Sequence, residues 1–146
     1  MFDPNAFLND TQTAAFATRR DPLPPGEVLC QITKLDTVSG EKNGRSWYKL
    51  NVVLDIADPA YLEKAQRDKA TITYGILLDM NEGGGLAMGP NRNIALGKLR
   101  EATGTNIPGK PLSAMIGQYV KAMISHRPDP VDPSIVYDDV KGVTRA

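Results

Sequence analysis

Residues 40–56, GEKNGRSWYKLNVVLDI, join a turn signal to a strand pattern. The Asn43-Gly44 pair is a strong hairpin signal, because both central positions of a two-residue turn need a positive φ. After it, apolar and polar residues alternate, and the apolar face that begins with Tyr48 is predicted to lie on the core. The stretch therefore predicts a hairpin, with a turn over 39–45 and a strand over 47–56.

Further strands are predicted on both sides of this hairpin. An alternating pattern from Gly26 puts Val28, Cys30 and Ile32 on the core face of the first strand. Short helices are predicted after Asp58-Pro59 and at 112–116, and a longer one over 94–103, with Asn93 as its N-cap and Gly104 after its end. The longer helix is expected to pack through Ile94, Leu96, Leu99 and Ala102. The remaining strands are predicted within 69–80, 118–126 and 135–143.

This order of elements predicts the fold class. Five strands with a helix between the third and fourth are the elements of an OB-fold, a small five-stranded barrel. We therefore expect a mainly β protein with a five-stranded OB-fold-like barrel, a helix between strands 3 and 4, and an N-terminal arm. The expected division is an arm over 1–25 and an OB-fold domain over 26–146.

The predicted arm contains all three phenylalanines of the chain, and a short helix is expected from Asp3-Pro4 through Leu8. A flexible tail seldom carries so many aromatic residues. We therefore expect the arm to dock either on the domain or on a second copy of the chain, which would make a homo-oligomer.

Composition narrows the class of protein. The 146 residues fit one domain, and the net charge is zero, with 17 basic and 17 acidic residues. A neutral chain counts mildly against nucleic-acid binding, so the distribution of the charges decides. Cys30 is the only cysteine, which excludes an intrachain disulfide. We expect neither a signal peptide nor a membrane-spanning segment.

Three patterns resemble catalytic or cofactor-binding motifs. GTNIPGKP (104–111) nearly spells a P-loop, but a helix precedes it and Pro111 replaces the hydroxyl residue; GGGLAMG (83–89) has the wrong spacing for a dinucleotide fingerprint. Asp129 and Asp139-Val140-Lys141 fit the acid-acid-lysine pattern of some metal-dependent nucleases, yet Asp129 stands in a proline-rich turn. His126 is the only histidine, so no zinc set or catalytic triad can be built. We expect a protein that is not an enzyme and has no metal or cofactor.

Trp47 carries the functional prediction. Side chains along a strand point alternately to its two faces, which puts Trp47 on the outward face with Lys49 and Asn51. An aromatic residue beside a cation suits base stacking there. The alternative is that the arm or a partner protein covers it. In an OB-fold, strands 2 and 3 and the loops 1–2 and 4–5 form the binding surface. The nucleic-acid-binding residues predicted on this basis are Trp47, Lys49, Asn51, Lys42, Arg45, Thr73, Tyr119, Lys121, Arg127 and Tyr137.

The chain also resembles bacteriophage OB-fold single-stranded DNA-binding proteins. The resemblance lies in FDPNAFLN (2–9), PPGEVLCQI (24–32), GGGLAMGPNRNIALGKLREATG (83–104) and VYDDVKGVTRA (136–146). It implies a protein that coats single-stranded DNA without sequence preference during phage DNA replication and recombination. It also implies replication proteins as partners, the cytoplasm of the infected bacterial host as location, and no membrane. Such proteins commonly end in an acidic tail, whereas this chain ends in GVTRA.

Two functions from different classes are thus expected. The first is sequence-independent binding of single-stranded DNA. The second is a phage structural or adaptor protein whose small β-barrel makes protein contacts through the arm and Trp47.

Overall fold

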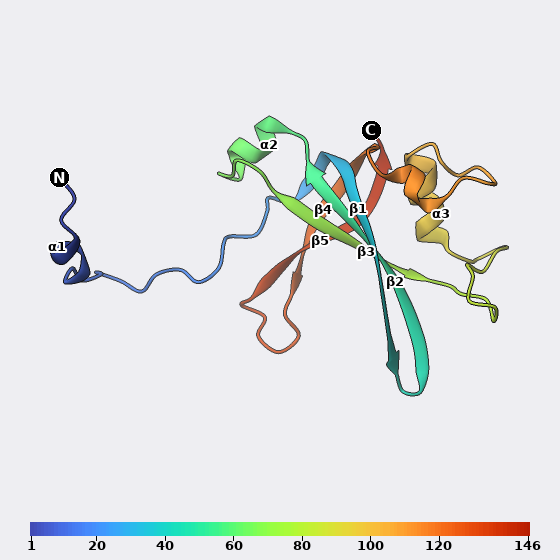
Figure 1. Ribbon diagram of the computed structural model, residues 1–146, viewed down its shortest axis with the longest axis horizontal. Helices are drawn as coiled ribbons and strands as arrows, with labels where there is room; N and C mark the ends of the chain where they lie inside the picture. Colours follow the sequence, from blue (N-terminus) through green and yellow to red (C-terminus); the bar gives the residue numbers. More distant parts are fainter.

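The computed structural model describes residues 1–146. The elements in chain order are α1 (Pro4–Leu8), β1 (Gly26–Lys42), β2 (Arg45–Ile56), α2 (Pro59–Lys64), β3 (Thr71–Leu78), α3 (Ile94–Ala102), the 3-10 turn η1 (Leu112–Met115), β4 (Tyr119–Pro128) and β5 (Val136–Arg145). The five strands form one antiparallel sheet in the order β3-β2-β1-β4-β5 (Figure 1). The prediction of a mainly β protein with five strands and a helix between β3 and β4 is confirmed.

The expected closure of the barrel is not completed by hydrogen bonds. β3 and β5 are the two edges of the sheet, and they approach each other without pairing. α3 packs against both strands at this seam. Tyr74 of β3, residues of α3 and residues of β5 line a cavity there, so side chains occupy the place where a closed barrel would have backbone pairs.

The core consists of 18 buried apolar residues, drawn from every strand and from α3. Val28, Cys30 and Ile32 are buried as the alternation predicted. A bulge between Ile32 and Lys34 then shifts the register, which leaves Lys34 exposed and turns Leu35 toward the core. Burial, with a smaller effect of the Asp55 charge, raises the pKa of the Cys30 thiol from 9.0 to about 11.

The β1–β2 hairpin is longer than predicted. Its turn is only Asn43-Gly44, with φ of 55° and 76°, and the strands pair as far as Lys42 and Arg45. The distal half of this hairpin extends beyond the core. Tyr48 is therefore 40% exposed, and its predicted core position is wrong. The alternation identified the face of Tyr48 correctly, but not how far the core reaches beneath it.

α3 agrees with the predicted helix except at its first residues. Leu96, Leu99 and Ala102 are buried, whereas Ile94 is 55% exposed. Asn93 precedes the helix but does not cap it, because its φ is 49° and its side chain bonds elsewhere. The Asn93 amide accepts a hydrogen bond from Asp79 N and donates to the carbonyls of Asp79 and Ala87. Asn93 therefore fastens the glycine-rich loop to the end of β3.

The N-terminal arm extends away from the sheet (Figure 1). α1 begins where predicted, with Asp3 accepting hydrogen bonds from the backbone of Asn5 and Ala6. Residues 1–22 are all exposed, so the phenylalanines of the arm do not dock on their own domain. Leu23, by contrast, is buried in the core.

Candidate nucleic-acid interface

Trp47 lies on the outward face of β2, where its indole packs against the backbone of β1. Its direct partner across the strand pair is Gly40. A Cβ added at Gly40 would come within 2.6 Å of indole Cζ2. Trp47 is consequently half-buried, and a residue without a side chain makes room for its ring.

Lys49 and Asn51 follow Trp47 on the same face. The stem of Lys49 crosses Gly75 of β3, so that an added Cβ at Gly75 would meet Lys49 Cε directly. Asn51 is the register partner of Gly75. Thr73 is exposed on the same strand, opposite Val53. The structure therefore brings four of the predicted residues together on the outer face of β2 and β3.

Lys42 and Arg45 form the tip of the β1–β2 hairpin. They are direct register partners, and both are exposed. The two ion pairs of the protein, Lys34–Asp36 and Lys121–Glu27, involve neither of them. Two cations without a carboxylate partner thus stand at the end of the hairpin that carries Trp47.

Arg127 and Tyr137 lie together on the β4–β5 hairpin. The Arg127 guanidinium stands 5.3 Å from the centre of the Tyr137 ring, a cation–π arrangement. The Tyr137 hydroxyl donates a 2.8 Å hydrogen bond to Asp129 Oδ2. This bond, after the larger effect of the Asp132 N–H, holds the pKa of Asp129 below its usual range. The cluster therefore includes a carboxylate that opposes phosphate binding.

Tyr119 and Lys121 occupy the outward face of β4, separated from β2 by β1. Tyr119 is 48% exposed. Lys121 Nζ lies 3.9 Å from Glu27 Oε1. The ten predicted residues therefore fall into separate groups on β2–β3, on the hairpin tip, on β4 and on the β4–β5 hairpin.

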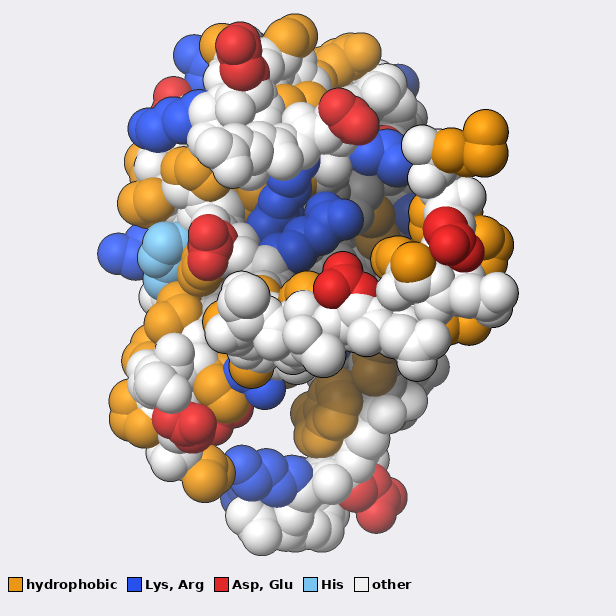
Figure 2. Space-filling view, turned by 90° about the vertical axis from the view of Figure 1, so that its left-hand side faces the viewer, with side chains coloured by type: hydrophobic (Ala, Val, Ile, Leu, Met, Phe, Trp, Pro, Cys, Tyr) orange, Lys and Arg blue, Asp and Glu red, His pale blue; other side chains and the backbone are white.

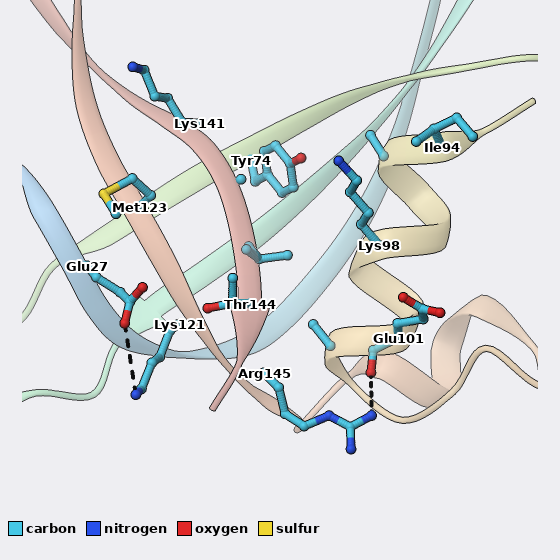
Figure 3. A pocket seen from close by; sticks show the side chains of 14 residues that line it. Glu27, Tyr74, Ile94, Lys98, Glu101, Lys121, Met123, Lys141, Thr144 and Arg145 are labelled. Carbon is cyan, nitrogen blue, oxygen red and sulfur yellow. Dashed lines mark hydrogen bonds and ion pairs between the residues drawn. The ribbon is translucent and has the colours of Figure 1, made fainter. Parts of the chain in front are cut away.

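The cavity at the β3–β5 seam has a volume of about 970 Å³ and is shown in Figure 3. Its cations are Lys98, Lys121, Lys141 and Arg145. In Figure 3, Lys98 extends toward Tyr74, whereas Lys141 extends away from both of these residues. Arg145 is engaged by a 2.9 Å hydrogen bond to the Glu101 carbonyl. Because these cations diverge, they do not form one anion-binding site.

Two glycines and one group of cations contribute to these surfaces without having been predicted from the sequence. Gly40 and Gly75 admit Trp47 and the Lys49 stem, and the signal for both was a glycine within a strand pattern. The missed cations lie at the base of the arm, at the end of α2 and in the α2–β3 connection.

No three His, Cys, Asp or Glu side chains gather in a geometry that could hold a metal ion. None of the helices has the length and apolar character needed to cross a membrane. No family model matches the chain, and a comparison with curated proteins finds no relative.

Proposed function

We propose that this protein binds single-stranded DNA without sequence preference, through an OB-fold-like barrel left open between β3 and β5. The observation that carries the proposal is the outward row of Trp47, Lys49 and Asn51 on β2, beside the two cations of the hairpin tip. The strand order and the position of α3 support the OB-fold-like arrangement.

Each part of this surface has a role that tolerates any base. A base stacked on an exposed aromatic face contributes about 1–3 kcal/mol, and every base has such a face. Lys42, Arg45 and Lys49 would contact phosphates and release counterions, so affinity would fall as salt rises. Asn51 and Thr73 would donate or accept hydrogen bonds at the backbone or at a base edge.

The neutral net charge does not oppose this function. Of the 17 basic residues, only Lys34 and Lys121 lie within ion-pair distance of a carboxylate. Most cations of the surface therefore remain available to phosphates. The cellular role implied by the resemblance, DNA replication and recombination in the cytoplasm of an infected bacterium with replication proteins as partners, belongs to this proposal.

The second candidate is an adaptor that binds proteins, and the arm favours it. Phe2, Phe7 and Phe16 are 68%, 63% and 76% exposed, and the rings of Phe2 and Phe7 stand 5.3 Å apart. Apolar surface of this kind suits a protein interface, including one with a second copy of the chain. In this reading Trp47 would lie under a partner protein.

The deciding experiment is a titration of Trp47 fluorescence with unstructured oligothymidine at low and high salt. Deep quenching that weakens with salt supports DNA binding. Trp47→Ala should then reduce affinity by the stacking contribution of about 1–3 kcal/mol while the fold persists. An unchanged signal at low salt, together with dissociation of an oligomer by Trp47→Ala, would favour the adaptor.

A further inference from the structure

A basic hollow lies between the base of the N-terminal arm and the α2–β3 connection. Its volume is about 950 Å³, and it is lined by residues within 17–24 and 64–69. Figure 2 views the molecule from the arm side and shows Lys and Arg side chains gathered in a hollow of that face. The charged residues of the lining are Arg19, Arg20, Lys64, Arg67 and Lys69, with Asp21 and Asp68.

Two hydrogen bonds join the walls of this hollow, and a third ties the base of the arm to β5. Arg67 donates a 2.6 Å hydrogen bond to the Asp21 carbonyl. The Tyr61 hydroxyl donates to the Pro24 carbonyl. Leu23 is buried in the core, and its N–H donates a 2.7 Å bond to Asp138 Oδ1. The base of the arm is therefore fixed to the domain, although residues 1–22 are exposed.

The charges of the hollow are not balanced within it. Five cations face two carboxylates, and both ion pairs of the protein lie elsewhere. Leu23, at the base of the arm, also contacts both strands of the β4–β5 hairpin: its N–H donates to Asp138 of β5, and its carbonyl oxygen lies 2.7 Å from His126 Nε2 of β4. The hollow thus adjoins the β4–β5 hairpin, which carries Arg127 of the predicted binding surface.

We propose that this basic hollow is a second phosphate-binding site, which holds the backbone of the same single strand that stacks on Trp47. The inference rests on the proposed function and extends its binding path to the arm. Few apolar residues line the hollow, so its occupant is polar. Guanidinium groups pair with phosphate oxygens in a forked geometry, and ammonium groups add point charges.

The test compares two double variants that remove equal charge. Arg20→Gln/Lys69→Gln reduces the charge of the hollow and spares Arg67, which anchors it. Lys98→Gln/Lys110→Gln removes two exposed cations from α3 and the loop after it. Oligothymidine affinity is measured against salt for both variants and for the wild type. The salt slope is the slope of the logarithm of the binding constant against the logarithm of the salt concentration. Each phosphate contact on a single strand contributes about 0.7 to its magnitude, so we expect the hollow variant, which loses two contacts, to lower it by about 1.4. The control should keep the wild-type slope.

Limited proteolysis supplies a readout independent of Trp47. Trypsin should cut after Arg19 and Arg20, which are exposed, and bound oligothymidine should slow these cuts more than the cut after Arg92 in the glycine-rich loop. Three results together would overturn the second site and leave the proposed function standing: the wild type binds oligothymidine, the hollow variant keeps the wild-type salt slope, and bound oligothymidine does not protect Arg20 of the wild type. That result is also expected if the hollow accepts an acidic protein segment. No binding by the wild type would overturn both.

Discussion

The indole of Trp47 packs against Gly40, its direct partner across the β1–β2 pair. The position of the ring depends on this glycine, because a methyl group there would come within 2.6 Å of indole Cζ2. The platform proposed for base stacking is therefore set by two residues, one on each strand of the hairpin.

Gly40→Ala should displace the indole of Trp47. We expect tryptophan emission to shift to longer wavelengths and acrylamide quenching to increase, at a cost of about 1 kcal/mol or less, because the ring can rotate away. The matched control is Gly97→Ala in α3, where an added Cβ meets nothing within 4 Å. That change should leave emission untouched and stabilise the helix by about 0.5–1 kcal/mol. Unchanged emission in Gly40→Ala would contradict the contact.

Gly75→Thr should lift the Lys49 ammonium from the sheet, since an added Cβ meets the Lys49 stem. Replacing a glycine within a strand removes a penalty of about 0.5–1 kcal/mol, so we expect the thermal midpoint to hold or rise. Oligothymidine affinity should fall toward that of Lys49→Gln. In the combined variant the two losses should not add, because they act on the same ammonium. Full additivity would show that Gly75 acts by another route.

Asp129→Asn should strengthen binding to oligothymidine. The amide is isosteric, and its oxygen can still accept from the N–H groups of Val131 and Asp132. Its NH2 group takes the place of Oδ2, so the bond with the Tyr137 hydroxyl reverses and the hydroxyl accepts. Removal of one negative charge beside Arg127 should raise affinity about two- to fivefold at low salt, since a unit charge at ~4 Å in water contributes about 1 kcal/mol. Glu82→Gln makes the same charge change in the glycine-rich loop. An equal gain in both variants would indicate a net-charge effect with no role for the β4–β5 hairpin.

Stability should decrease in alkaline solution because two acids are held neutral in the fold. The pKa of Cys30 is raised from 9.0 to about 11, and burial, then the Asp138 charge, raise the pKa of Tyr61 from 10.0 to about 12. Between these values the unfolded chain releases protons that the folded chain retains, so the free energy of unfolding falls as pH rises. This stabilisation is complete below pH 9 and is lost as pH passes 11 for Cys30.

Denaturant titrations from about pH 6 to about pH 11 measure this loss, and Cys30→Ala should flatten the decline of the free energy of unfolding above pH 9 relative to the wild type. Below pH 8 the two curves should run parallel. A decline of equal steepness in both proteins above pH 9 would assign the pH dependence to other groups.

The alternation of apolar and polar residues predicted which face of each strand packs on the core, because the alternate direction of side chains is a local property of the strand backbone. It could not predict how far the core extends, which is why Tyr48 was misplaced. Asn93 was misread for a similar reason: its partner Asp79 lies across a loop whose path depends on the folded chain. The cations at 19–20 and 64–69 share no sequence period. They come together only in the folded chain, where Arg67 bonds the Asp21 carbonyl and Tyr61 bonds the Pro24 carbonyl.

The seam between β3 and β5 also bears on how the protein avoids self-association. Unpaired strand edges are templates for adding a further strand, and they favour fibrils when they are exposed. Here the two edges face each other, and α3 packs against both. Each edge therefore shields the other from a third strand, and the sheet gains a barrel's resistance to edge-to-edge aggregation without the hydrogen bonds of a closed ring.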